Sequence, residues 1–189
     1  MHAHAMTVAA MGTVALAGAL WIFSSTSVNG DPSPQSAPTA RMGTVPDELI
    51  KKHLTLPVPG IHAEDLVPQF YDARGERGHE ALDIIAPRGE PVVAVEDGKI
   101  AKLFVNKPGG NTIYQFDPTE TYAYYYAHLD RYAEGLAEGD MVKRGQVIGY
   151  VGSTGNAADP HLHFAIFRLE PEKEWWKGEP LDPYPALAR

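Results

Sequence analysis

The stretch HLHFAIFR, residues 161–168, has the alternating pattern of a half-buried β-strand. Neighbouring side chains of a strand point to opposite faces, so His161 and His163 share one face with Ala165. The other face carries the apolar side chains of Leu162, Phe164 and Ile166. Two imidazoles side by side on a polar strand face indicate a cleft rather than a pair of core histidines.

Short strands of this kind recur along the chain. They are predicted at residues 82–85, 91–95, 99–105, 112–116, 121–128, 146–151 and 162–168. Turn-forming segments rich in Gly, Pro, Asn and Asp separate them, for example at residues 87–89, 108–111 and 153–156. A short helix is predicted within residues 45–56, with Pro46 in its first turn. The sequence therefore predicts a mainly β fold, a compact antiparallel β-sheet domain of sandwich or barrel type.

Composition limits the chemistry. The 189 residues are 44% hydrophobic, enough for one core, and carry a formal net charge of -8, which disfavours a nucleic-acid binder. The chain has no cysteine, so a metal ion would be held by nitrogen and oxygen ligands. Its eight histidines are therefore the natural candidates for ligands.

The N-terminal part of the chain differs in composition from the rest. Residues 6–23 form an uncharged apolar run, which predicts an N-terminal apolar helix acting as an export signal or a membrane anchor. A buried helix is the alternative. Residues 24–44 are rich in Ser, Pro, Thr and Ala and predict a flexible linker. These assignments leave residues 45–189 as the folded domain.

The pair His79 and Asp83, and the isolated His128, join the paired histidines in a candidate catalytic site. A catalytic zinc ion commonly has three protein ligands and an open position, and His79, Asp83 and His163 supply that number. Asp83 lies in an apolar strand and needs a partner, which is either the metal or an arginine at position 74, 77 or 88. His128 and His161 are then left to stabilise the charge that develops in the reaction.

Alternation also places Tyr122, Tyr124 and Tyr126 on the strand face of His128, as an aromatic wall leading to the site or as core packing. Glu80 follows His79 as in a helical His-Glu-x-x-His motif, but the second histidine is absent, so Glu80 is interpreted as a solvated neighbour. The remaining histidines, at positions 2, 4, 53 and 62, are expected at the surface. The pair Trp175-Trp176 either packs the C-terminal tail or lines a groove.

At these residues the chain resembles the lysostaphin-type, LytM-like zinc peptidases, which cut peptide bonds in bacterial peptidoglycan. The similar segments are GHEALDI at 78–84, YAHL at 126–129, the glycine-spaced GDMVKRGQVIG at 139–149 and GNAADPHLHF at 155–164. The resemblance implies a fold of the duplicated hybrid motif type, with a groove across the sheet. It also implies that His79, Asp83 and His163 bind Zn²⁺ and that His128 and His161 are catalytic. Ala81 and Ala165 replace a glycine and a glutamate that are common in the family, and neither position carries a metal ligand or a catalytic group.

The function expected is a zinc-dependent endopeptidase acting on peptidoglycan cross-links in the periplasm or cell envelope, anchored in the inner membrane through residues 6–23. One alternative is a catalytically silent module of the same fold that binds peptidoglycan or regulates a hydrolase. A second is a biotin, lipoyl or phosphohistidine carrier, suggested by VAVEDGKI at 93–100 but lacking the Met-Lys pair of a swinging arm. The sequence makes no prediction of the oligomeric state or of the bond that is cut.

Overall fold

The structure is a computed structural model that describes residues 45–74 and 77–189. The predicted apolar helix at 6–23 and the linker at 24–44 lie outside the described residues. Among the helices that are described, none has the length and apolar character needed to cross a membrane. The strands are β1 (Ala73–Arg74), β2 (Arg77–Gly78), β3 (Leu82–Ile85), β4 (Pro91–Val93), β5 (Gly98–Asn106), β6 (Gly110–Phe116), β7 (Tyr122–Leu129), β8 (Arg131–Tyr132), β9 (Met141–Val142), β10 (Val147–Tyr150), β11 (His161–Leu169) and β12 (Gly178–Leu181). The helices are α1 (Asp47–Lys51), the 3-10 turn η1 (Ala63–Asp65) and α2 (Tyr184–Leu187).

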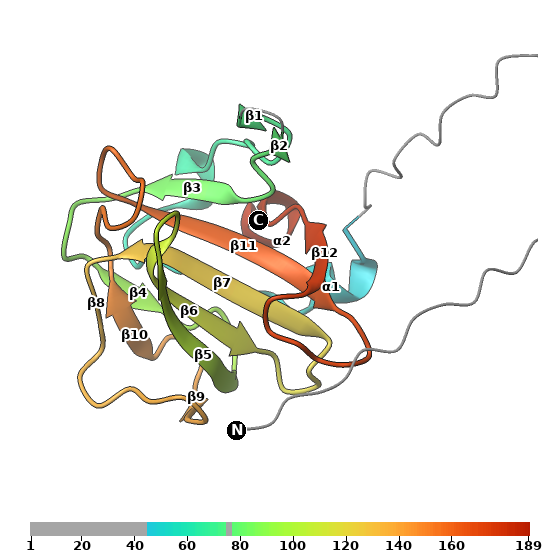
Figure 1. The fold of residues 1–189 in the computed structure, drawn as a ribbon. Coiled ribbons are helices and arrows are strands. Elements are labelled where there is room, and N and C mark those ends of the chain that lie inside the picture. Colours follow the sequence, from blue (N-terminus) through green and yellow to red (C-terminus); the bar gives the residue numbers. More distant parts are fainter. Residues whose placement is uncertain (1–44, 75–76) are drawn as a thin grey trace, which may run out of the picture. The chain divides into compact units, whose positions relative to one another are not determined.

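A seven-stranded sheet forms the body of the domain, in the order β12-β11-β7-β6-β5-β9, with β3 added against β11. All of its pairings are antiparallel, and Figure 1 shows the long strands β5, β6, β7 and β11 side by side. A second sheet, β4-β10-β8, has three strands. The mainly antiparallel β fold is therefore confirmed. In the described chain the large sheet has two ends, so it is not a closed barrel.

The two faces of the large sheet have different roles. Directly paired residues of an antiparallel sheet share a face, and the pairs Phe164↔Tyr126 and Ile166↔Tyr124 lie on the face that forms the core. All four of these side chains are fully buried. The opposite, outer face carries His163, whose partner on β7 is the small Ala127. Small side chains beside the histidine leave this face open for a site.

The strand β12 is an element that the sequence pattern did not reveal. Its four residues, GEPL, contain both Gly and Pro, which are rare inside strands. The strand forms because β11 extends to Leu169 and offers β12 a paired edge from Ile166 to Leu169. Because β12 is an edge strand of the sheet, it tolerates Pro180.

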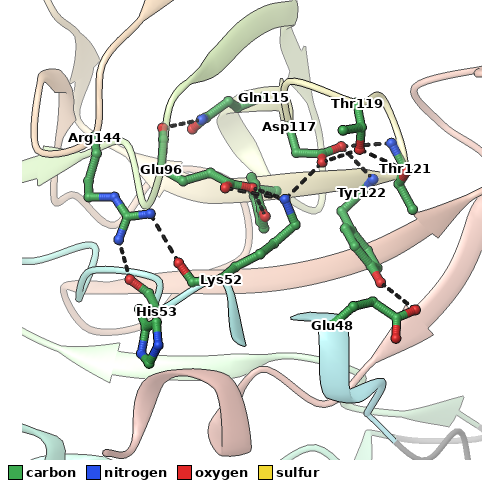
Figure 2. Close-up of polar contacts among 11 residues, drawn as sticks. Glu48, Lys52, His53, Glu96, Gln115, Asp117, Thr119, Thr121, Tyr122 and Arg144 are labelled. Atoms are coloured by element: carbon green, nitrogen blue, oxygen red, sulfur yellow. Dashed lines mark hydrogen bonds and ion pairs between the residues drawn. The ribbon is translucent and has the colours of Figure 1, made fainter. Parts of the chain in front are cut away.

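The segment that begins with α1 is attached to the core face by a largely buried polar cluster, which we call the inner cluster: Lys52, Glu96, Asp117 and Tyr124. Figure 2 shows Lys52 with Glu96 and Asp117. Lys52 Nζ donates to Glu96 Oε1 and to Asp117 Oδ2, each at 3.0 Å. The Tyr124 hydroxyl donates to Glu96. Leu49 of α1 is fully buried in the same core. Residues 47–52 are therefore an integral part of the domain.

Candidate active site

Register between β3 and β11 brings together two of the predicted site residues. Asp83 is the direct partner of His163, and Ile85 is the partner of His161. Figure 1 shows β3 lying along β11 at the edge of the sheet. Leu82 and Ile84 of β3 are buried, so Asp83 projects from the outer face as the alternation of a strand requires.

His79 reaches the same place from the loop between β2 and β3. Its backbone N–H donates to Asp72 O at 2.8 Å, and the next N–H, of Glu80, donates to Phe70 O at 2.9 Å. Glu80 has a φ of 55°, in the left-handed region, and the chain turns there into β3. Its side chain is exposed, as expected for a solvated neighbour.

Three donor atoms converge. His79 Nε2 lies 3.0 Å from Asp83 Oδ1 and 3.2 Å from His163 Nδ1, and His163 Nδ1 lies 2.9 Å from Asp83 Oδ1. A tetrahedral zinc ion with ligand bonds of about 2.0–2.1 Å separates its donors by roughly 3.3 Å. The triangle found here is close to that size. These three residues also form a group whose ligand atoms all lie within 4.8 Å of one another, and so they can hold a metal ion.

The state of the His79 ring supports this geometry. The side chain of His79 is 4% exposed, and within the described part of the chain its Nδ1 has no hydrogen-bond partner. The contacts of the ring are therefore made through Nε2, the atom that faces Asp83 and His163. Burial lowers the pKa of His79, which favours the neutral imidazole that a metal ion requires.

Asp83 is ionised in this environment. Burial alone would raise its pKa, but the hydrogen bond and charge of His163, with the charges of His79 and His161, hold the pKa at about 2. Its second oxygen, Oδ2, accepts a hydrogen bond from Arg74 Nη2 at 2.8 Å. The salt bridge and the metal-binding arrangement, which the sequence presented as alternatives, therefore coexist on the two oxygens of one carboxylate.

The second pair of histidines, His128 and His161, lies beside this triangle, with ring centroids 4.8 Å apart. Nδ1 of His161 lies 2.8 Å from Asp159 O, and Nδ1 of His128 lies 2.8 Å from Thr154 O. A carbonyl oxygen can only accept, so each Nδ1 carries the proton and donates it. Each Nε2 therefore points away from the carbonyl, and that of His161 lies 3.7 Å from Asp83 Oδ1.

The position of His128 corrects the strand prediction. Simple alternation puts its side chain on the face of Tyr126, and this is wrong, because its ring centroid lies 5.6 Å from that of His163. His128 has a φ of 60°, which interrupts the alternation at the end of β7. The predicted aromatic wall is also wrong: Tyr122, Tyr124 and Tyr126 are at most 1% exposed and belong to the core, as the packing alternative held.

A cavity of about 470 Å³ opens over these residues. It is lined by the five site residues, by Arg74, Gly78 and Ile85, and by residues 156–159 of the loop before β11. That loop is supported by the β5–β6 turn, because Asn156 N donates to Pro108 O at 3.0 Å and Asn111 N donates to Thr154 Oγ1 at 3.0 Å. The loop before β11 and the β5–β6 turn are thus linked.

Sequence reasoning did not single out Arg74 and missed Tyr125, both neighbours of the site. Arg74 was one of three arginines considered for Asp83, with nothing in the sequence to select it. Tyr125 lies on the outer face, and its ring makes an edge contact with that of His163, centroids 6.1 Å apart. The alternation that puts Tyr124 and Tyr126 in the core would have identified it. His53 and His62 are exposed, as expected, while His2 and His4 lie outside the described residues.

Comparison with known proteins places this arrangement in context. A model described as "Peptidase family M23" matches residues 77–183, a range that contains all five site residues. The L-Ala--D-Glu endopeptidase of Bacillus subtilis is 39% identical over 126 residues, covering 61% of this chain and 37% of that protein. The peptidoglycan DD-endopeptidase ShyC of Vibrio cholerae is 39% identical over 88 residues, covering 47% of this chain and 20% of that protein. This chain therefore matches well under half the length of either relative.

A solved structure is similar as well. The antimicrobial peptidase lysostaphin from Staphylococcus simulans superposes with a TM-score of 0.56 at 31% identity, covering 65% of this chain and 48% of that structure.

Proposed function

The chain belongs to peptidase family M23, and from this we propose that it is a zinc-dependent endopeptidase that hydrolyses peptide cross-links of bacterial peptidoglycan. The observation that carries the proposal is the convergence of His79, Asp83 and His163 beside a second pair of imidazoles. The printed names of the two relatives, both endopeptidases and one a peptidoglycan DD-endopeptidase, support it.

In this proposal His79 Nε2, Asp83 Oδ1 and His163 Nδ1 hold Zn²⁺. Two neutral imidazoles and one ionised carboxylate suit zinc, and the chain has no cysteine to compete with them. Zinc in such a site supplies Lewis acidity, which polarises a carbonyl group and makes a water molecule more acidic. Arg74 binds the other oxygen of Asp83 and so fixes the rotation of the carboxylate.

His128 and His161 handle protons. Both direct Nε2 away from the backbone carbonyl that fixes the ring. Burial lowers the pKa of His128, so at neutral pH its Nε2 accepts a proton from the attacking water. A histidine protonated in this way donates to the oxyanion of the tetrahedral intermediate, and the departing amine then takes up a proton.

The proposed substrate lies outside the cytoplasm, and the relatives named for peptidoglycan support an exported or periplasmic location. Export, and anchoring through residues 6–23, rest on the apolar run in the sequence. The domain proposed for the activity is 45–189. A catalytically silent module is disfavoured, because such a module would be expected to have lost site residues, and all five are present and close together.

The test is the release of soluble fragments from purified sacculi by the full chain, with and without zinc. Mass spectrometry of the products from a defined cross-linked muropeptide identifies the bond. Release that disappears on chelation and returns with zinc is the expected result. Failure to release fragments from several types of sacculus with zinc bound would overturn the proposal.

A further inference from the structure

The outer face of the large sheet carries a continuous row of aromatic rings that begins at the site. We call it the aromatic strip: Tyr125, Tyr114, Trp175 and Trp176. Starting from His163, the successive ring centroids are 6.1, 4.6, 4.9 and 5.1 Å apart. The proton transfer and metal binding proposed above use none of these four side chains.

Register puts the strip on the same face as the site. Tyr114 on β6 is the direct partner of Tyr125 on β7, and Tyr125 is the partner of Ala165 on β11, which shares its face with His163. The two tryptophans come from the loop between β11 and β12. This loop is held on the sheet by Trp175, which packs against the cluster of Phe116, Ala123 and Leu169. The strip is therefore a fixed extension of the site.

The far end of the strip is available to a ligand. Trp176 is 61% exposed, whereas Trp175 packs against Phe116, Ala123 and Leu169. A large exposed indole beside a partly buried one is typical of a recognition surface. A cavity of about 40 Å³ lies between Tyr114, Phe167, Trp175, Trp176 and Gly178.

The size and charge of this surface limit what it binds. The small cavity is large enough to hold a methyl-sized group. Two cations near the tryptophans are paired within the chain, Lys177 with Glu170 at 2.7 Å and Arg168 with Glu179 at 3.3 Å. An uncharged ring with a small apolar substituent fits both conditions.

The distance between Trp176 and the site limits which ligands can reach both. The four ring-to-ring steps put Trp176 no more than roughly 20 Å from His163, which is the length of about six extended residues. A peptide of up to about six residues that runs from the site to a sugar can therefore span this separation. We infer that the aromatic strip binds an N-acetylated sugar of the glycan strand that carries the cleaved peptide, with the sugar ring on Trp176 and the acetyl methyl group in the small cavity.

This inference rests on the proposed function. An assay with three substrates distinguishes the failure of one from the failure of the other. The full chain is assayed on one cross-linked peptide in three forms: bare, joined to its N-acetylated disaccharide, and joined to the same disaccharide without acetyl groups. A single aromatic contact predicts a three- to tenfold lower KM for the acetylated form than for the bare peptide. The form without acetyl groups should lose most of that gain.

Trp176→Ala should raise KM for the acetylated form. The kcat/KM of that form, divided by the kcat/KM of the bare peptide, should then fall close to one. Trp176→Phe should recover part of the ratio. Met141→Ala, which removes an exposed apolar side chain of β9, should leave it unchanged. If none of the three forms is cleaved by the wild-type chain, the proposed function fails. If the bare peptide is cleaved but the disaccharide gives no advantage, or if Trp176→Ala slows all three forms equally, the sugar site is refuted.

Discussion

Two clusters of ionisable side chains, on the two faces of one sheet, differ in where their positive charge comes from. In the inner cluster, the carboxylates of Glu96 and Asp117 converge on Lys52 Nζ, each at 3.0 Å (Figure 2). At the site, Asp83 and two imidazole nitrogens converge on one another, 2.9 to 3.2 Å apart, and within the described residues no lysine or arginine lies between them. Arg74 binds only the outer oxygen of Asp83.

The difference teaches how a structural cluster is distinguished from a metal site. Buried carboxylates need a cation, because an unpaired charge in the interior is costly. The inner cluster obtains its cation from the chain itself and is complete on folding. The cluster around Asp83 instead brings together three groups of the kinds that bind a metal ion. If this contrast holds, removing a group should affect stability at the first cluster and chemistry at the second.

The largest effect is expected from His163→Ala. The variant removes one of three donors, so it should lose both stoichiometric zinc and all measurable release of fragments from sacculi. Zinc content by elemental analysis and product release by chromatography are the two measurements. His62→Ala, at an exposed histidine outside the site, should match the wild type in both.

His161→Ala should separate metal binding from turnover. Because Nε2 of His161 is proposed to stabilise charge rather than bind the metal, the variant should keep its zinc while kcat falls by roughly 10²–10³. Isothermal titration of the metal-free protein with zinc, combined with kcat on a defined muropeptide, tests both statements. Loss of zinc along with kcat would show that His161 is a ligand and that the proposed division of roles is wrong.

Lys52→Met, in the inner cluster, should lower stability and leave the chemistry of the site unchanged. It leaves two buried carboxylates without their cation, and the free energy of unfolding should fall by about 3 kcal/mol, measured by urea denaturation. Lys143→Met, which breaks the exposed pair of Lys143 with Asp97, should cost less than about 1 kcal/mol. The folded fraction of Lys52→Met should retain the zinc content and kcat of the wild type, and a loss of zinc would contradict the contrast.

The smallest expected effect is on how the free energy of unfolding depends on pH in acid. Burial would raise the pKa of Asp117, but hydrogen bonds from Tyr122 N and Thr119 and the nearby Lys52 lower it overall. A folded-state pKa below the unfolded one means that the unfolded chain binds more protons, so this stabilisation is present above about pH 4 and is lost as the pH falls through the folded pKa.

Asp117→Asn should therefore show a flatter dependence of unfolding free energy on pH below about pH 4 than the wild type. Asp97, whose pKa is lowered mainly by a hydrogen bond from Lys143, is exposed, and its contribution should be screened by added salt. Identical pH dependence of Asp117→Asn and the wild type at high salt would show that the buried carboxylate contributes nothing.

The parts of the fold that were predictable are those in which one local pattern decides the outcome. Alternation along residues 161–168 identified β11, its buried face and the shared face of His161 and His163. The spacing of His79 and Asp83 indicated the rest of the donor set. These residues sit on or beside regular strands, where sequence period and side-chain direction are directly related.

What was missed depends on backbone geometry or on long-range contacts. His128 faces the site because of one left-handed residue at a strand end, which breaks the period that the prediction used. The strand β12 exists because β11 offers it an edge, not because its own residues favour a strand. Lys52, Glu96 and Asp117 come from three separate segments, and nothing in their spacing shows that they meet.

The attachment of α1 has a practical consequence for where the domain can be cut. The family model begins at residue 77, yet Leu49 is fully buried in the core, and Lys52 neutralises Glu96 and Asp117, which lie inside the matched range. Arg144, also inside that range, donates to the carbonyl oxygens of Lys52 and His53. The segment matched by the family model is therefore shorter than the segment that packs into one core. A truncation designed from sequence similarity alone would leave two buried negative charges and an exposed core surface, whereas one that begins at residue 45 keeps both covered.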